Sequence, residues 1–324
     1  PLADALLDRI GEVRRALASD LGIVMPGVRL RDDLTRDAST YAIRVRDTVV
    51  AEGRLCLDRV LAVAGEEILG RFHGERVREP VYGLAAVWIE PGEREFAVAN
   101  GALCFDPISI VGSHLAEVVR SHASALLGRQ ELHTLVEHLR ASVPSLVKEI
   151  GTDALPLATV QRVFELLLRE RVWPRDTVMV LEALVDASIA TRDARDLAES
   201  VRRKLVPHQL RRRNIAILEP LIVDPQFETE LHGWLVDGSL APQPQTAWHV
   251  RSVASSYAAS VVRERAAIVC TGALRPALAD FLSRFGVAVD VFAYAELPPE
   301  LELRPAVVLG YPTTTIEQPG AISA

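Results

Sequence analysis

Apolar residues in the first twenty positions recur at the spacing of one helix face. Leu6, Ile10, Val13 and Leu17 are three or four positions apart, which places their side chains on one side of an α-helix. Pro26 and Gly27 follow and interrupt the helical pattern. The pattern therefore predicts an amphipathic helix over residues 1–20.

The chain up to about residue 100 then alternates as half-buried strands do. Tyr41, Ile43 and Val45 alternate with more polar positions, and Arg46–Asp47 suits a tight turn into a second strand. A further β-rich segment, residues 79–91, is predicted to carry Trp88 into the core.

Helical periodicity replaces this alternation from Asp106 onward. Gly128 and Pro144 are placed to end the first two helices. Asp176 and Asp193 lie near later helix starts, where a carboxylate accepts hydrogen bonds from free backbone N–H groups. The predicted helices are 111–127, 130–143, 156–172, 174–190 and 193–210.

Strands return near residue 215. A strand at 215–225 and a short helix at 226–235 are followed by helix 248–264, strand 266–272, helix 274–286 and strand 289–297. A strand–helix–strand unit places its two strands parallel, so we expect a small α/β layer here. Residues 313–324 have little apolar content and are predicted to be a flexible tail.

Composition and charge indicate an ordinary multidomain soluble protein of 324 residues. The formal net charge of −7 provides no general positive field for nucleic acid. The three cysteines lie far apart without a CxxC pair, which argues against a disulfide scaffold and a thiolate zinc site. No stretch reaches the roughly 18 apolar residues of a membrane span. The chain begins with Pro1, so we expect a fragment of a longer protein.

Four histidines lie between residues 114 and 140. His114 and His122 are separated by about 80° around a helix and by two turns along it, and His133 and His138 by about 140°. A helical zinc pair requires a spacing near four. We therefore expect surface or half-buried helix residues and predict no metal site.

The common motifs of enzymes do not occur in the sequence. It has no GxSxG, HExxH or CxxC motif, and Thr271–Gly272 is a lone glycine turn instead of a GxGxxG loop. An anion could still bind at the following helix N-terminus, so a nucleotide- or anion-binding enzyme domain built on the C-terminal α/β unit stays an alternative. Arg211–Arg213 leaves open a basic surface for RNA, lipid or an acidic partner.

Several separate motifs resemble those of the type III protein export gate family, which comprises the flagellar FlhA and injectisome SctV proteins. Residues 79–89, EPVYGLAAVWI, resemble the family's EPAFGLPALWI, and residues 106–139 resemble its DxxxVxxHLxxVIxxHAxELxGRQE segment. Residues 21–34 and 274–310 resemble its LGxxxPxVRxRD segment and its final strand, helix and SYxELPPxV segment. The motifs follow in the right order, so the chain is identified as a member of this family.

The resemblance implies a mixed α+β fold of four compact subdomains. These are an N-terminal α/β subdomain (1–103 plus 151–171), a helical insertion (104–150), a mainly helical ring-building subdomain (172–240) and a C-terminal α/β subdomain (241–312). It also implies the cytoplasmic module of an export gate on the bacterial inner membrane, with no catalytic residue, metal or cofactor. The implied partners are further copies in a nonameric ring, chaperone–substrate complexes, the export ATPase complex with its stalk and the membrane half of the same protein, but not nucleic acid.

Two sets of site residues follow from the resemblance. A hydrophobic dimple beside the helical insertion would dock chaperone–substrate complexes through Leu126, Leu127, Arg129, Gln130, Ala158 and Thr159. Leu127 replaces an aromatic residue of flagellar members and Ala158–Thr159 a threonine pair, so the choice between flagellar and injectisome members stays open. Candidates for the ring interface are Arg175, Asp176, Arg202 and Arg203. Because exposed ion pairs contribute only about 0–1 kcal/mol each, we expect the isolated module to be monomeric when dilute.

Overall fold

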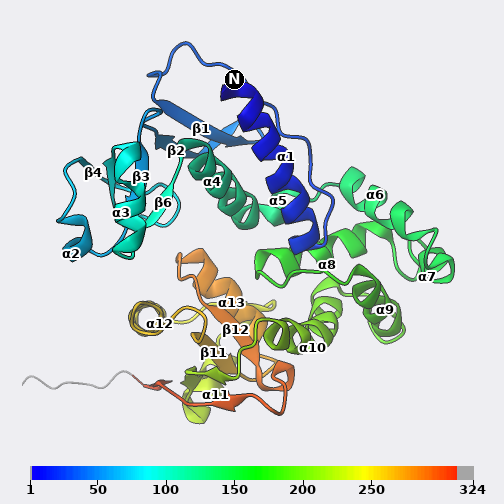
Figure 1. Cartoon of the computed structure of the whole chain (residues 1–324). Helices are drawn as coiled ribbons and strands as arrows, with labels where there is room; N and C mark the ends of the chain where they lie inside the picture. Colours follow the sequence, from blue (N-terminus) through cyan, green and yellow to red (C-terminus); the bar gives the residue numbers. More distant parts are fainter. Residues whose placement is uncertain (1, 312–324) are drawn as a thin grey trace, which may run out of the picture. The chain divides into compact units, whose positions relative to one another are not determined.

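The structure is a computed structural model that describes residues 2–311. The chain divides into two compact units between Ala198 and Glu199, within helix α10 (Ala194–Arg212) (Figure 1). Both units combine helices with strands, which confirms the predicted mixed α+β class. The predicted tail at 313–324 lies outside the described residues.

The first unit contains a β-hairpin at the predicted place. Strands β1 (Thr40–Val45) and β2 (Thr48–Arg54) pair antiparallel, and the turn residues Arg46 and Asp47 have φ angles of 48° and 66°. Positive φ at both turn residues matches the right-handed twist of the flanking strands. The predicted tight turn is confirmed.

A four-stranded antiparallel sheet follows in the order β4-β5-β3-β6. Its two faces bury different side chains: Ala62 and Val87 face the short helices α2 and α3, whereas Leu61 and Trp88 pack with Ile110 of helix α4. Trp88 is buried, as predicted. The elements are β3 (Val60–Val63), α2 (Glu66–Leu69), β4 (Glu75–Arg78), β5 (Ala85–Ile89), the 3₁₀ turn η1 (Pro91–Glu93), α3 (Arg94–Ala99) and β6 (Leu103–Phe105).

Helix α1 (Leu2–Leu21) packs beside α4 (Pro107–Ser121) (Figure 1). Asp106 caps α4 by accepting a hydrogen bond from the Ser109 amide at 2.9 Å. The helix predicted over 111–127 is wrong in one respect, because it breaks at His122 and resumes as α5 (Ala123–Leu126). His122 leaves helical geometry with φ −112° and ψ 13°, a break that no proline or glycine announces in the sequence.

Helices α8 and α9 follow the predicted periodicity, whereas α6 ends at Leu139, ahead of Pro144, and Pro144 begins a short helix, α7, that was not predicted. Asp176 caps α9 by accepting from the Met179 amide at 3.0 Å, as its position predicted. Val160, Val163, Phe164 and Leu167 form the buried face of α8. The helices are α6 (Arg129–Leu139), α7 (Pro144–Glu149), α8 (Leu157–Arg169) and α9 (Thr177–Ser188).

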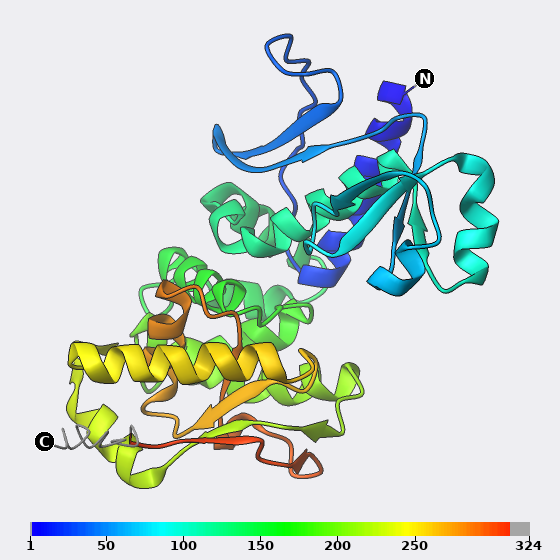
Figure 2. The same cartoon turned by 90° about the vertical axis from the view of Figure 1, so that its left-hand side faces the viewer.

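The second unit is built on a parallel sheet in the order β12-β11-β8-β14. Strands β11 (Ala267–Cys270) and β12 (Asp290–Ala293) are joined through α13 (Arg275–Arg284), which confirms the predicted parallel pair. Helix α12 (Pro244–Ser260) crosses one face of this sheet (Figure 2). Strand β8 (Leu221–Val223) is a central member, so the predicted subdomain boundary at residue 240 separates it from its partners.

Short elements complete this unit. Helix α11 (Pro225–Gly233) follows β8, β14 (Val307–Leu309) forms a sheet edge and η2 (Tyr294–Glu296) is a 3₁₀ turn. The two small pairs are β7 (Ile217–Leu218) with β13 (Glu302–Leu303) and β9 (Leu235–Val236) with β10 (Ser239–Leu240). Across the described residues, no helix combines the length and apolar character that a membrane crossing requires.

Candidate docking site

The predicted docking residues come from three neighbouring helices of the first unit. Leu126 ends α5 and is half-buried, and α5 packs against α8. Ala158 is exposed and Thr159 half-buried in the first turn of α8. The Gln161 side chain of α8 donates to the Leu127 carbonyl at 3.5 Å, which links the two segments.

Leu127 itself is 1% exposed and packs inside the unit. Its inclusion among residues that touch a partner is therefore corrected, because a side chain in the core does not reach a docked protein. A leucine that follows a helix and precedes Gly128 gives no signal of which way it points. Leu127 instead supports the surface that Leu126 and α8 present.

The first turn of α6 adds a polar margin to this surface. The Gly128 amide donates to the Glu131 carboxylate at 3.0 Å, which closes the helix start. Arg129 and Gln130 are exposed in that turn, as expected for docking residues. The accessible members of the predicted set are therefore Leu126, Arg129, Gln130, Ala158 and Thr159.

His114 corrects a second expectation, because it is buried, whereas the histidines of this stretch were predicted to be surface or half-buried residues. Its Nδ1 lies 2.7 Å from the Tyr41 hydroxyl, which joins the β1–β2 hairpin to α4. Burial raises the pKa of Tyr41 and lowers the pKa of His114, which favours the neutral form of both groups. The tautomer of the ring then decides which of the two donates. The described residues contain no cluster of His, Cys, Asp or Glu that is arranged to bind a metal ion.

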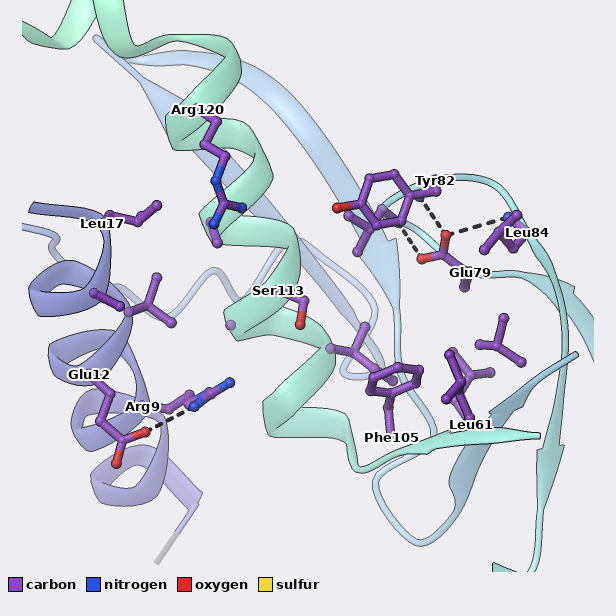
Figure 3. Close-up of a pocket in the computed structure, with 18 residues that line it drawn as sticks. Arg9, Glu12, Leu17, Leu61, Glu79, Tyr82, Leu84, Phe105, Ser113 and Arg120 are labelled. Carbon is purple, nitrogen blue, oxygen red and sulfur yellow. Dashed lines mark hydrogen bonds and ion pairs between the residues drawn. The ribbon is translucent and has the colours of Figure 1, made fainter. Parts of the chain in front are cut away.

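A cavity of about 520 Å³ lies between α1, α4 and the antiparallel sheet (Figure 3). Glu79 shapes the loop at one side of it, since its buried carboxylate accepts from the amides of Val81 at 2.7 Å and Tyr82 at 2.5 Å. This cavity was not predicted from the sequence. Its only sequence signal is Gly112, a glycine in the middle of an otherwise regular helix.

The predicted ring residues differ in how accessible they are. Arg202 is 2% exposed and donates to the Glu296 carboxylate at 2.6 Å and the Val291 carbonyl at 3.1 Å. It is a core residue of the second unit, so its assignment to a ring surface is corrected. Arg175 donates to the Asp20 carbonyl at 2.5 Å, and Asp176 is the α9 cap described above. Arg203 is exposed.

The candidate anion site after strand β11 is already occupied by a carboxylate of the same unit. Glu228 of α11 is 6% exposed, and its carboxylate accepts from the Thr271 amide at 2.7 Å and the Thr271 hydroxyl at 2.6 Å. These are the donors that a phosphate would use after β11, and a carboxylate already there repels a second anion. This geometry argues against the nucleotide-binding alternative.

The basic run at Arg211–Arg213 is likewise largely matched by carboxylates. Arg211 pairs with Glu300, and Arg213 lies 3.9 Å from Asp290. The described residues therefore provide little unmatched positive charge at this place for RNA or lipid.

The fold defines a mixed α+β module of two compact units. Comparison identifies the family: residues 2–302 match the FHIPEP family model, and the chain belongs to that family. It is 34% identical over 321 residues to the flagellar biosynthesis protein FlhA of Bacillus subtilis, covering 94% of this chain and 47% of that protein. The chain spans about half the length of this relative. The predicted export gate family is thereby confirmed.

Solved structures share the fold. The Chlamydia pneumoniae CdsV protein superposes with a TM-score of 0.83 at 22% identity, covering 93% of this chain and 90% of that one. The nonameric EPEC SctV-C gives a TM-score of 0.74 at 20% identity, with 94% and 93% covered. At these identities the likeness establishes the architecture alone.

Proposed function

We propose that this chain is the cytoplasmic module of a type III protein export gate, at the inner membrane of a bacterium, where it docks export chaperones and their substrates. The observation that carries the proposal is the family match across residues 2–302, which spans both units. The module acts by binding and performs no covalent chemistry. The membrane half of the parent protein and the export ATPase complex are its further partners; in support, the CdsV relative has been solved in complex with CdsO.

Docking takes place on the surface formed by α5, the first turn of α6 and the start of α8. Leu126, Ala158 and Thr159 offer small apolar contacts, and Arg129 and Gln130 form a polar margin. An amphipathic partner helix recognises such a surface through a few apolar anchors surrounded by weaker polar contacts. Burial of Leu127 beneath it keeps the surface in one shape.

The module assembles into a ring of identical copies, for which the nonameric SctV-C relative is the precedent. Arg203 is the exposed candidate for the interface, with Arg175 and Asp176 partly committed within their own unit. The four-subdomain division, with its insertion at 104–150, is part of this proposal, except that the ring-building subdomain ends before β8, because β8 belongs to the sheet of the C-terminal subdomain. Polar contacts of this kind are weak and screened by salt, so the isolated module is monomeric when dilute. Sedimentation showing a ring that persists on dilution in high salt contradicts this.

The test of docking is a titration with flagellar and injectisome chaperone–substrate complexes. Ala158→Asp is expected to weaken binding at least about tenfold, because it places a charge among apolar contacts. A carboxylate in the first turn of α8 is favourable for the helix, so the fold should survive. Ala154→Asp, at an exposed position just before α8, is the matched control. Failure of both kinds of complex to bind contradicts the proposed function, and binding that ignores Ala158→Asp contradicts the docking surface.

A further inference from the structure

The cavity between α1, α4 and the sheet, of about 520 Å³, lies within the size range of ligand pockets, about 300–1,000 Å³. Its walls are mainly apolar, and they come from four separate elements and one loop (Figure 3). The apolar lining residues include Val13 and Leu17 of α1, Leu61 and Val63 of β3, Phe105 of β6 and Ile110 of α4. A ligand that removes this surface from water gains hydrophobic free energy in proportion to the apolar area covered.

Gly112 shapes the helix wall of the cavity. A Cβ at this position would lie 2.8 Å from Nε and 3.0 Å from Cγ of Arg9, so any larger residue would push the Arg9 side chain from its place against α4. A glycine in a helix interior costs roughly 0.5–1 kcal/mol relative to alanine. Figure 3 shows Arg9 reaching from α1 toward α4. The helix therefore gives up some stability at the point where it accommodates a guanidinium beside the cavity.

That guanidinium has an unmet hydrogen-bond donor. Nη1 of Arg9 donates to Glu12 at 2.9 Å, but the buried Nε has no acceptor among the described residues. A buried donor without a partner costs about 1–3 kcal/mol. Nε itself is enclosed against α4, so an oxygen in the cavity meets the outer end of the Arg9 side chain, which is 38% exposed.

Arg120 adds a second cation to the same wall. Its ion pairs with Glu117 and Asp20 both measure 3.9 Å, which is too long for a hydrogen bond. The two carboxylates that line the cavity are already engaged, Glu12 by Arg9 and Glu79 by backbone amides of its own loop. The α1–α4 wall is thus the side of the cavity that favours a carboxylate, which arginine binds with charge-assisted hydrogen bonds.

The mouth of the cavity is also apolar. Tyr82, Leu84 and Leu103 line it and are 60%, 51% and 64% exposed. Exposed apolar side chains around an apolar cavity form a recognition surface that extends beyond the enclosed volume. A small amphiphile would fill the cavity and leave them uncovered, whereas a chain of amino acids covers both.

We propose that this cavity is a second docking site, which binds a segment of a partner protein that carries bulky apolar side chains next to an aspartate or glutamate. The apolar side chains enter between α1, α4 and the sheet, and the carboxylate pairs with Arg9, while Arg120 lies further along the same wall (Figure 3). The site deepens the proposed export function and rests on it, because export clients and their chaperones are then the source of the segment.

The test uses the whole chain and fluorescein-labelled short peptides tiled across the flagellar export chaperones and exported proteins of Bacillus subtilis. Fluorescence polarisation is expected to select peptides that combine large apolar residues with Asp or Glu. Arg9→Met keeps the aliphatic stem but removes the guanidinium, and Gly112→Ala displaces it by the close approach described above. Each should weaken binding about tenfold or more, the loss of one charge-assisted hydrogen bond. Arg15→Met, an exposed position on the same helix outside the cavity, should change nothing.

Thermal unfolding of Gly112→Ala checks that the fold survives, which the better helix propensity of alanine favours. Absence of any bound peptide, or binding that Arg9→Met and Gly112→Ala leave unchanged, overturns the proposal. Two other results also overturn it by identifying a different occupant. If sodium decanoate changes the NMR chemical shifts of cavity residues while no peptide binds, the occupant is a small amphiphile. If Gly112→Ala changes the sedimentation of the peptide-free chain, the occupant is a second copy of the chain.

The proposed function fails by a different observation. Intact chaperone–substrate complexes that bind and respond to Ala158→Asp, while no peptide binds, leave the export function standing and remove only the cavity site. If peptides bind and respond to Arg9→Met while no intact complex binds, the cavity site stands and the proposed docking of chaperone–substrate complexes is removed.

Discussion

Each unit buries one carboxylate that accepts from backbone amides, Glu79 in the first and Glu228 in the second, but the units differ in their other buried polar groups. The second unit pairs charge with charge: Arg202 with Glu296, and Arg275, which is 1% exposed, with Glu199 at 2.7 Å. The first unit buries the neutral pair of Tyr41 and His114 and leaves Arg9 Nε without an acceptor. Groups already satisfied inside a protein gain nothing from a ligand, whereas unmet ones do. Recognition is therefore expected in the first unit.

Removing one member of a buried ion pair should give the largest effect. Arg202→Met leaves the Glu296 carboxylate buried without its cation, which typically costs about 3–5 kcal/mol. Hydrogen exchange, followed peptide by peptide in the whole chain, should show this loss in the second unit. The double variant Arg202→Met with Glu296→Leu should recover most of it, because no uncompensated charge remains. A loss equally large in the double variant would mean that shape, and not charge, holds this core.

Removing the Glu228 carboxylate that follows strand β8 should have the next largest effect on stability. Glu228→Ala leaves the Thr271 amide and hydroxyl without their acceptor and should cost about 1–3 kcal/mol in urea unfolding. Sulfate should then raise the melting temperature of the variant more than that of the wild type, because the helix N-terminus becomes free for an anion. Glu228→Gln, which retains an acceptor oxygen, is the control. Equal sulfate response in wild type and variant would show that Glu228 does not block this site.

Elements with a local cause were predictable from the sequence. The Arg46–Asp47 turn, the Asp176 cap and the strand–helix–strand unit after residue 265 depend on a few neighbouring residues, and the structure contains all three. The helix break at His122 has no such local cause. It was missed because neither proline nor glycine is present there.

Burial of individual polar residues was the part that local patterns did not predict. Arg202 and Arg203 are adjacent arginines, yet one is buried against a carboxylate 94 positions later and the other is exposed. His114 is buried because Tyr41, far away in the chain, supplies its partner. The cavity likewise requires α1, the sheet and α4 to meet. Such features depend on tertiary contacts between distant segments, which periodicity does not encode.

Substitutions at Asp176 can distinguish its role as the cap of α9 from its proposed role in the ring interface. Asp176→Ala removes the α9 cap and should cost about 1 kcal/mol, measured by urea unfolding. Asp176→Asn keeps a capping oxygen and should retain most of that stability while it removes the charge. If the charge also serves the ring, the asparagine variant should assemble more weakly at a concentration where the wild type forms oligomers. Unchanged assembly would restrict Asp176 to its cap.

His114 should give the smallest effect and the sharpest contrast with the ion pairs of the second unit. Burial holds its pKa below the value of about 6.5 that the unfolded chain has, so the unfolded chain takes up the proton first as the pH falls. The stability that a neutral His114 provides is therefore present above pH 6.5 and is lost as the pH falls toward the folded-state pKa. Between pH 7.5 and 6.0 this amounts to at most about 0.8 kcal/mol. Urea unfolding at both values should show a smaller pH dependence in His114→Gln than in the wild type. The exposed His138→Gln should behave as the wild type does. If His114→Gln keeps the full pH dependence, the Tyr41–His114 contact tolerates a charged ring, and the hairpin is held in place by packing and by the Arg46 hydrogen bond to the Ala125 carbonyl of α5 at 2.6 Å.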